Sequence, residues 1–339
     1  MKQYLLEPRN DGPAELVLHE VEPAALSTGE VRVRIDASSL NYRDLLMKSG
    51  QSASGGTNTV VPLSDGAGVI VEIGPEVMEW KIGDSVALTF FRDWESGRFR
   101  MDYHAAARGG SCDGVLAETV VAPIHSLVRV PDYLTTREAA TLPCAAVTAW
   151  HAMMERGQPV GAGDTILCLG TGGVSLFALQ IAKAVGARVV ITSSSDEKLA
   201  AAAILGADET INYRATPDWD REVYARTGKR GVDGVIEVGG PGTLEKSMNS
   251  VAAGGFIAQI GVLTGFAPAE ASLFPIVTKN ADLRGIYVGS REMFDRMLVF
   301  FEQHQIHPVI DSTFAFTEAA AAYSRLESAT HSGKIVISG

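Results

Sequence analysis

The chain has 339 residues, of which 46% are hydrophobic and 20% charged, which is ordinary usage for a folded protein and too apolar for a disordered one. At roughly 150 residues per domain, this length predicts two domains and excludes a single small module. The net charge of -11 argues against nucleic acid or a membrane surface as a partner, because surfaces that follow phosphates need an excess of Lys and Arg.

The cysteines and the first residues indicate the compartment. Cys112, Cys144 and Cys168 lack C-x-x-C spacing, so neither a disulfide framework nor a four-cysteine zinc lobe is expected. Glu7 and Pro8 stand where a signal peptide would continue its apolar core, and no run approaches the roughly 20 apolar residues that span a bilayer. We therefore expect a soluble cytoplasmic protein with reduced thiols.

The first 120 or so residues have the pattern of an all-β unit. VRVRI (31–35) alternates apolar and charged residues, and VIVEI (69–73) is almost continuously apolar, as expected of strands. Glycines separate these short runs, as at the turns between strands. This region is predicted to form a compact β-barrel.

After Pro143, helices and strands alternate. TAWHAMMERG (148–157) is helical, and a strand over 165–169, a glycine turn, a helix ending near Gly186 and a strand over 188–192 form a βαβ unit. The alternation continues through helical 196–206, strand-like 209–213, helical 220–228 and strand-like 234–238 and 256–262. It predicts a parallel sheet with helices on both faces. FAFTEAAAAYSRLES (314–328) is expected to be a helix, and KIVISG (334–339) a last strand.

The glycine turn is a candidate dinucleotide site. It follows an apolar strand and opens a helix, and it consists of Gly170, Thr171, Gly172, Gly173 and Val174. Glycines allow a tight turn and close approach to a pyrophosphate, whose charge is stabilised by the free N–H groups at the helix start. Ser175 stands where the third glycine of G-x-G-x-x-G would be. The alternative is a glycine turn that only joins strand to helix.

The end of the second strand of this unit distinguishes between cofactors. NAD is recognised there by an acidic residue, which would repel a 2'-phosphate. Here the strand ends in Thr192, Ser193 and Ser194, and Lys198 follows one turn into the next helix. Hydroxyl and ammonium donors favour NADPH, although Lys198 also fits a solvated helix lysine. Asp196 is the opposing observation, and we expect it to cap that helix.

With these motifs the sequence resembles the medium-chain dehydrogenase/reductase superfamily, and within it the zinc-independent, quinone-oxidoreductase-like and alcohol-dehydrogenase-like members. The resemblance covers the whole chain and rests on several motifs in order, which are SSLNYRDLLMKSG (38–50), PLSDGAGVIVEIG (62–74), DGVLAETVVAP (113–123), AATLPCAAVTAWHAM (139–153), the glycine turn and LGADETINYR (205–214).

The resemblance implies an α/β protein with a GroES-like β-barrel catalytic domain (1–123 and 289–339) and a Rossmann domain with a doubly wound parallel sheet (124–288), with the nicotinamide and the substrate meeting between them. It implies that Asn41 and Thr148 lie near the nicotinamide and that Tyr213 joins Ser193, Ser194 and Lys198 around the 2'-phosphate. Further cofactor contacts are implied at strand ends, namely Val238, Gly239, Gly261, Val262, Ile286 and Tyr287. Lys334 is a further candidate, with an exposed strand lysine as the alternative.

The family comparison also bears on metal. In the zinc-dependent relatives the catalytic metal is held at the positions of Asn41, Ser64 and Cys144, of which only the cysteine is a good zinc ligand. His304 and His307 have the spacing of a ligand pair, but we favour a solvated pair near a helix end. We expect no metal.

Without a metal, hydride addition to a conjugated carbonyl is easier to catalyse than oxidation of a simple alcohol, because hydrogen-bond donors can hold the resulting oxygen charge. The expected activity is therefore NADPH-dependent reduction of an α,β-unsaturated carbonyl or quinone, a small-molecule substrate. Tyr42, beside Asn41, is the candidate proton donor, and a packed barrel tyrosine is the alternative. Phe90, Phe91 and Trp94 open a long loop that is a candidate wall of the substrate cleft together with Cys144, and ordinary loop packing is the alternative.

Two other functions remain open. One is an NAD(P)-dependent alcohol dehydrogenase or aldehyde reductase, and the other is an NADPH-binding protein without turnover, since glycines and serines establish binding only. The resemblance also implies a homodimer formed through the sheet edge near 283–290.

Overall fold

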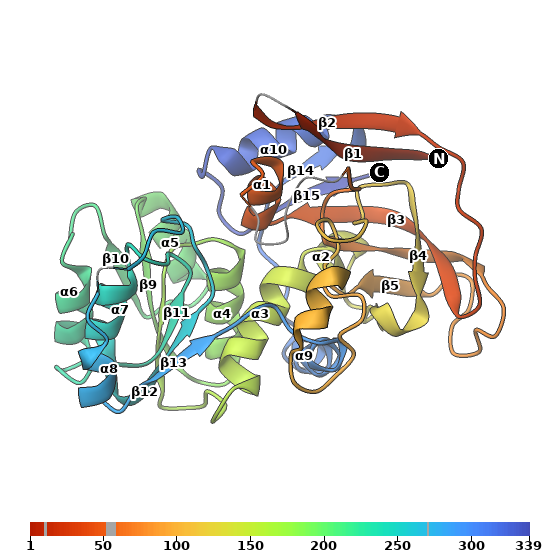
Figure 1. Ribbon diagram of the computed structural model, residues 1–339. Coiled ribbons are helices and arrows are strands. Elements are labelled where there is room, and N and C mark those ends of the chain that lie inside the picture. Colours follow the sequence, from red (N-terminus) through yellow and green to blue (C-terminus); the bar gives the residue numbers. More distant parts are fainter. Residues whose placement is uncertain (10–11, 52–58, 270) are drawn as a thin grey trace. The chain divides into compact units, whose positions relative to one another are not determined.

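The computed structural model describes residues 1–9, 12–51, 59–269 and 271–339 and divides into two compact units (Figure 1). Unit 1 is Met1–Val147 with Val288–Gly339, and unit 2 is Thr148–Tyr287. The sequence placed the first domain boundary at 123. Residues after 123 remain with unit 1 because the strand 127–129 pairs with 85–88 and because the Ser39 hydroxyl donates to the Ala140 carbonyl at 2.9 Å.

Unit 1 is mainly antiparallel. Its larger sheet has the strand order β14-β15-β3-β4-β5-β7, β6 also pairs with β3, and β1 and β2 form a separate pair. Among the pairs of named strands in the described part of unit 1, β14–β15 is the only parallel one. The bounds are β1 Lys2–Arg9, β2 Gly12–Glu20, β3 Glu30–Leu40, β4 Asp65–Ile73, β5 Ser85–Leu88, β6 Thr119–Pro123, β7 Leu127–Arg129, β14 Ile310–Ala315 and β15 Lys334–Ser338.

The alternation noticed in the sequence explains the position of β3. Val31 and Val33 are fully buried in the core of unit 1, whereas Arg32 between them reaches the Glu72 carboxylate of β4 at 2.7 Å. Successive strand residues face opposite sides, so the apolar set covers the core and the charged set lies toward solvent. The expected strands and the GroES-like unit are confirmed.

The helices of unit 1 are short except near the carboxyl end of the chain. Their bounds are α1 Tyr42–Lys48, α2 Thr136–Ala139, α9 Arg291–His304, α10 Ala319–Glu327, the 3-10 turns η1 Met101–Ala106, η2 Ile124–Ser126 and η5 Phe316–Glu318, and the π-helical turn η3 Leu142–Ala146, while α3 Val147–Trp150 crosses the unit boundary. The expected helix over 314–328 was wrong at its start. Phe314 and Ala315 belong to β14, because they pair with Ile337 and Ser338 of β15.

Unit 2 is a six-stranded sheet in the order β10-β9-β8-β11-β12-β13, and all of its pairings are parallel (Figure 1, green to blue). Helix α4 packs on β8 and β9, and α7 packs on β11 and β12. The bounds are β8 Thr165–Cys168, β9 Arg188–Ser193, β10 Glu209–Asn212, β11 Val232–Glu237, β12 Val251–Gln259, β13 Asp282–Gly285, α4 Gly173–Ala184, α5 Asp196–Ile204, α6 Trp219–Arg226, α7 Leu244–Ser250, α8 Phe274–Thr278 and the π-helical turn η4 His151–Glu155. This arrangement confirms the Rossmann sheet.

The chain order reverses between β8 and β11. After β8 it proceeds outward through β9 and β10, and it then crosses to β11 on the other side of β8. Open α/β sheets bind ligands at the carboxyl ends of the strands at such a reversal. The turn after β8 and the loop after β11 therefore form the part of unit 2 to inspect for a ligand site.

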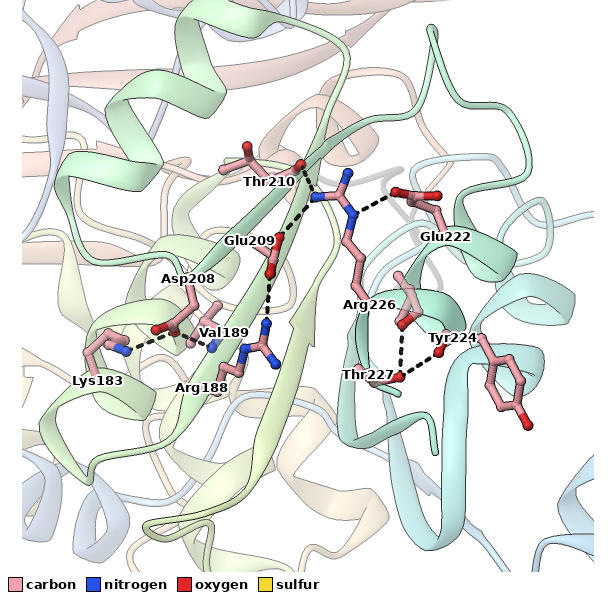
Figure 2. A network of polar contacts seen from close by, with 11 residues as sticks. Lys183, Arg188, Val189, Asp208, Glu209, Thr210, Glu222, Tyr224, Arg226 and Thr227 are labelled. Carbon is pink, nitrogen blue, oxygen red and sulfur yellow. Dashed lines mark hydrogen bonds and ion pairs between the residues drawn. The ribbon is translucent and has the colours of Figure 1, made fainter. Parts of the chain in front are cut away.

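The opposite, amino ends of β9 and β10 carry a structural ion-pair network (Figure 2). Glu209 accepts from Arg188 at 2.7 Å and from Arg226 at 3.0 Å, and Arg226 also reaches Glu222 at 2.7 Å. Beside them Lys183 donates to Asp208 at 2.8 Å. This network joins α6 to the outer strands and lies away from the strand ends where a nucleotide is expected.

Across the described residues, we find no helix that combines the length and apolar character needed to cross a membrane.

Candidate functional site

The glycine turn after β8 leaves room for a ligand against its backbone. Gly170 has a φ of +73°, in the region that favours glycine, and its amide donates to the Thr192 hydroxyl of β9 at 3.2 Å. Apart from the adjacent residues of the chain, no described heavy atom lies within 4 Å of the position that a Cβ would take at Gly170 or at Gly172. Gly172 precedes the 12-residue helix α4 and supplies no side-chain cap. The helix start thus combines open space with amide donors, which suits a phosphate group.

Ser175 fills the third position of the glycine pattern. Its side chain is buried, and its hydroxyl donates to the Leu169 carbonyl at 2.6 Å. A serine is small enough for α4 to pack closely on the strand, and its hydroxyl also satisfies the carbonyl at the turn. Thr171 is buried in the same turn.

The end of β9 carries serines, and the tyrosine that follows β10 lies beside them. Ser193 is buried, and its carbonyl accepts from the Tyr213 amide at 3.0 Å. Ser194 is half-buried, and Tyr213 is 40% exposed. This hydrogen bond brings Tyr213 beside Ser193, and the role of the two residues around a 2'-phosphate stays a prediction.

Asp196 has a different role from the expected one. The N-cap of α5 is Ser195, whose hydroxyl accepts from the Lys198 amide at 3.4 Å, and Asp196 is the first helical residue. The Asp196 carboxylate instead accepts from the Asn212 side chain at 2.6 Å. Its expected capping role was wrong because Ser195 is the residue with the extended backbone that an N-cap requires.

The loop after β11 is shaped by Glu237, which the sequence analysis did not single out. This carboxylate is fully buried, and one of its oxygens accepts from the Gly239 amide at 2.7 Å, the Gly240 amide at 2.9 Å and the Thr243 hydroxyl at 2.6 Å. Its other oxygen accepts from the Ser247 hydroxyl. The sequence signal was an acidic residue that closes an apolar strand directly before two amide donors of a glycine-rich loop.

The other residues of unit 2 that were predicted to contact the cofactor at strand ends lie close to this loop or directly after β13. Gly261 approaches Val238 so closely that a Cβ there would lie 2.0 Å from the Val238 carbonyl oxygen, and Gly240, next to Gly239, lies near the backbone of Val262. Ile286 follows β13 and is buried, and Tyr287 is 40% exposed. Thr148 is buried in α3.

Unit 1 contains a polar group that we call the Lys334 cluster, consisting of Asn41, Ser64, Asp65, Cys144 and Lys334. The Lys334 ammonium is 3% exposed and donates to the Leu40 carbonyl at 2.7 Å and to Asn41 Oδ1 at 2.5 Å. It also pairs with the Asp65 carboxylate at 3.5 Å. Lys334 is therefore not the exposed strand lysine that the sequence analysis left as an alternative.

The Asp65 carboxylate connects the other members of the cluster. It is fully buried and accepts from the Ser64 hydroxyl at 2.7 Å and from the Cys144 amide at 3.3 Å. Burial, together with the nearby Asp65 charge, raises the pKa of the Cys144 thiol far above its usual range. The thiol is consequently protonated at neutral pH.

Asn41 precedes α1, whose first turn is held by Asp44. The Asp44 carboxylate accepts from the Asn41 amide at 2.7 Å, and burial raises the pKa of Asp44 to about 6, against the lowering effect of the neighbouring Arg43 charge. The Arg43 guanidinium donates to the Arg108 carbonyl at 2.9 Å and lies over the Phe90 ring. Arg43 and Asp44 thus make structural contacts within unit 1, and Tyr42 is 37% exposed.

The aromatic residues of the long loop pack against one another. Phe90, Phe91 and Trp94 are buried, and their rings make edge contacts with centroids 4.7 Å (Phe90–Phe91) and 5.8 Å (Phe91–Trp94) apart. The structure accordingly shows the loop packing that was the alternative, and their role as a wall of the substrate cleft stays a prediction.

The two histidines with ligand spacing do not come together as a metal site. His304 ends α9 and its ring contacts Phe300, whereas His307 bonds to the Glu138 carboxylate at 2.7 Å. Throughout the described ranges, no three His, Cys, Asp or Glu side chains gather in a way that would hold a metal ion.

Comparison with known proteins identifies the family. Residues 27–132 match the model of the alcohol dehydrogenase GroES-like domain, and residues 173–303 match that of the zinc-binding dehydrogenases. A zinc-type alcohol dehydrogenase-like protein of Schizosaccharomyces pombe is 43% identical over 99% of this chain and 98% of its own length. A quinone oxidoreductase of Pseudomonas aeruginosa is 30% identical over 96% of both chains.

A solved structure supports the same assignment. A Sinorhizobium meliloti protein described as an alcohol dehydrogenase superposes with a TM-score of 0.91 at 39% identity, and all of both chains is covered. The chain thus belongs to the medium-chain dehydrogenase/reductase superfamily, as a zinc-type alcohol dehydrogenase-like member and an NAD(P)-dependent oxidoreductase.

Proposed function

We propose that this enzyme reduces α,β-unsaturated carbonyls or quinones with NADPH and without a catalytic metal. The observation that carries the proposal is the buried Lys334 ammonium bonded to Asn41 Oδ1 and paired with Asp65. It puts a protein cation among the residues that correspond to the metal ligands of the zinc-dependent relatives.

The residues at these positions do not fit a catalytic zinc ion. Zinc needs three good nitrogen, sulfur or carboxylate ligands and an open position. Asn41 Oδ1 is taken by Lys334, and the Ser64 hydroxyl donates to Asp65. An ammonium this close would also repel a dication, with little solvent to screen it.

The choice of NADPH is supported by the end of β9. Ser193 and Ser194 stand where NAD-specific proteins carry a carboxylate, and the Asp196 carboxylate is engaged by Asn212. We propose that Ser193, Ser194, Lys198 and Tyr213 hold the 2'-phosphate and that the amides of Gly172, Gly173 and Val174 hold the pyrophosphate. The same proposal includes Val238, Gly239, Gly261, Val262, Ile286, Tyr287 and Thr148 as contacts along the dinucleotide.

The bound cofactor would supply a hydride to the β-carbon, so that the alkene pair becomes the enolate double bond, the carbonyl pair moves onto the oxygen, and a proton added at the α-carbon completes the saturated product. The protein's task is to hold that oxygen and deliver the proton. Asn41 Nδ2 is a donor without a partner among the described residues, and the half-exposed Tyr42 follows it in the chain. We propose that the amide stabilises the developing charge and that the Tyr42 hydroxyl donates the proton.

The test is turnover with a panel of substrates. Purified enzyme mixed with NADPH should lose absorbance at the reduced nicotinamide band when an enone or a quinone is added, and dialysis against a chelator should leave the rate unchanged. Elemental analysis should find less than stoichiometric zinc. No turnover of any activated alkene or quinone, or loss of activity on chelation, would contradict the proposal.

The second candidate is an alcohol dehydrogenase or aldehyde reductase, which is favoured by the names of the S. pombe and S. meliloti relatives. It predicts that primary or secondary alcohols reduce NADP+ at a rate comparable with enone reduction. The same assay run in the oxidative direction separates the two. Binding of NADPH with no turnover in either direction would favour the third reading, a binding protein.

We also propose that two copies associate through β13. This strand ends the sheet order, and on it Leu283 is 41% exposed. An unpaired strand edge can pair with the same edge of a second copy and bury such residues. Light scattering should give the mass of a dimer, and Leu283→Lys should shift it toward the monomer. A monomer at micromolar concentration would contradict this arrangement.

A further inference from the structure

The orientation of the Asn41 side chain is determined by its neighbour. An ammonium group has donors and no acceptor, so the amide atom 2.5 Å from Lys334 Nζ must be the oxygen. The other atom of the planar carboxamide, which points away from Lys334 within that plane, is then the nitrogen Nδ2. This argument fixes an assignment that the positions of the heavy atoms alone leave open.

Within the described residues, the side-chain nitrogen of Asn41 is a buried donor whose hydrogen-bonding capacity is unsatisfied. Asn41 Nδ2 is shielded from solvent and lacks a hydrogen-bond partner in the part of the chain that the structure describes. Leaving a buried donor unpaired is unfavourable, because the donor has lost its bonds to water, and such donors are rare in folded proteins. An unpaired donor beside the predicted reaction site indicates that a ligand atom completes the bond.

The Lys334 ammonium is fixed by contacts with three residues. Its ammonium donates to the Leu40 carbonyl at 2.7 Å and lies 3.5 Å from the Asp65 carboxylate, and the antiparallel pairing of Ile335 with Leu40 brings it to Asn41. These contacts fix the position of the Lys334 ammonium, and its bond to Oδ1 fixes the orientation of the Asn41 carboxamide. The Asn41 amide is held by Asp44 at 2.7 Å, so backbone and side chain are both fixed.

We propose that Lys334 is a positioning residue, which turns the Asn41 carboxamide so that its NH2 group donates to a carbonyl oxygen of a bound reactant. The proposal rests on the reductase function above and names the residue that presents the donor. The charge of Lys334 also polarises the amide and so makes Nδ2 a stronger donor. The carbonyl oxygen belongs either to the substrate or to the carboxamide of the nicotinamide.

A double-mutant cycle tests this role. With the enone found in the turnover assay, Asn41→Ala should lower kcat/KM by about 100-fold, the usual effect of removing one oxyanion donor. Lys334→Met should lower it by about tenfold, since a freed amide still presents Nδ2 for part of the time. In the Asn41→Ala background, Lys334→Met should then cost less than twofold more, because Lys334 has no amide left to orient.

Two further measurements guard against misfolding and identify the acceptor. Lys334→Met leaves Asp65 without its cation, so the cycle is repeated on Asp65→Asn, which removes the unpaired charge.

The dissociation constant for NADPH, from reduced-nicotinamide fluorescence, separates the sources of the oxygen. If Asn41→Ala changes the NADPH dissociation constant less than threefold, the acceptor is the substrate carbonyl. If that constant instead rises by the factor by which kcat/KM falls, the acceptor is the nicotinamide carboxamide.

A matched lysine serves as the control. Lys279 belongs to unit 2, where it donates to the carbonyls of Met248, Asn249 and Val251 at 2.7–2.8 Å, whereas the Lys334 cluster belongs to unit 1. Lys279→Met should lower the melting temperature and leave kcat/KM within twofold.

The cycle can overturn the inference. If Lys334→Met costs the same factor with and without the Asn41 side chain, Lys334 acts only on stability. If wild-type enzyme is active and Asn41→Ala keeps full kcat/KM, Nδ2 donates to nothing in the reaction. Wild-type enzyme without enone turnover would instead count against the proposed function.

Discussion

The Ser175 hydroxyl donates to the Leu169 carbonyl at 2.6 Å, across the turn in which the third glycine of a dinucleotide motif is expected. The bond ties the first turn of α4 to the residue that follows β8. It shows how a serine substitutes for glycine here, because it is small enough for close packing and satisfies a carbonyl that the turn would otherwise leave unpaired.

Ser175→Ala should therefore lower the free energy of unfolding by about 1 kcal/mol, the usual value of one buried hydrogen bond. Ser175→Gly should lower it further, because glycine is less favourable in a helix by up to about 1 kcal/mol. Urea denaturation of the three proteins measures both steps. Equal stability of Ser175→Ala and wild type would show that the bond contributes nothing.

Ser194→Asp should change the cofactor preference. A carboxylate at the end of β9 repels a 2'-phosphate and accepts from ribose hydroxyls, so the NADPH dissociation constant should rise at least about tenfold while that of NADH stays within about threefold. Titration followed by nucleotide fluorescence gives both constants. Lys183→Ala removes a lysine of α4 that pairs with Asp208 beside the amino ends of β9 and β10. This control should leave both dissociation constants unchanged. A wild-type preference for NADH would contradict the assignment.

Glu237→Gln should be among the most damaging single-atom changes in unit 2. The amide replaces an acceptor oxygen by an NH2 group, although both carboxylate oxygens face donors from Gly239, Gly240, Thr243 and Ser247. The expected loss is about 2–4 kcal/mol, measured by denaturation. The same substitution at exposed Glu245 of α7 should stay within about 0.5 kcal/mol. A similar small effect at both positions would argue against the role of Glu237.

Asp44 makes stability depend on pH in a predictable direction. Burial raises its pKa to about 6 in the folded chain, against about 4 when unfolded, so between these values the folded state holds a proton that the unfolded state has lost. The contribution of Asp44 to stability therefore falls as the pH rises from about 4 through about 6.

Asp44→Asn removes this titration while its side-chain oxygen can still accept from the Asn41 amide. Relative to wild type, the variant should gain about 1 kcal/mol between pH 5 and pH 7.5. Urea unfolding at the two pH values gives the difference, and a difference that does not change with pH would show that the Asp44 carboxyl titrates normally.

Much of the fold was predictable because it depends on local patterns. The alternating VRVRI run and the glycine turn between β8 and α4 each carry their signal within a few residues. The prediction for Phe314 and Ala315 failed because their state depends on pairing with β15. The prediction for Asp196 failed because three neighbouring serines and an aspartate can all cap a helix by residue type. Ser195 is the N-cap because its backbone is extended and its hydroxyl accepts from the Lys198 amide.

The sequence by itself determined the class of protein and the alternation of strands and helices after Pro143, because residue types and their spacing along the chain are enough for these inferences. Only the tertiary structure decided which polar groups meet. Lys334 and Asn41 are 293 residues apart, and Glu237 collects donors from a loop and a helix that follow it. The contact of Lys334 with Asn41 depends on strand register, and the donors of Glu237 gather only when the loop after β11 closes, so residue type alone did not identify these partners.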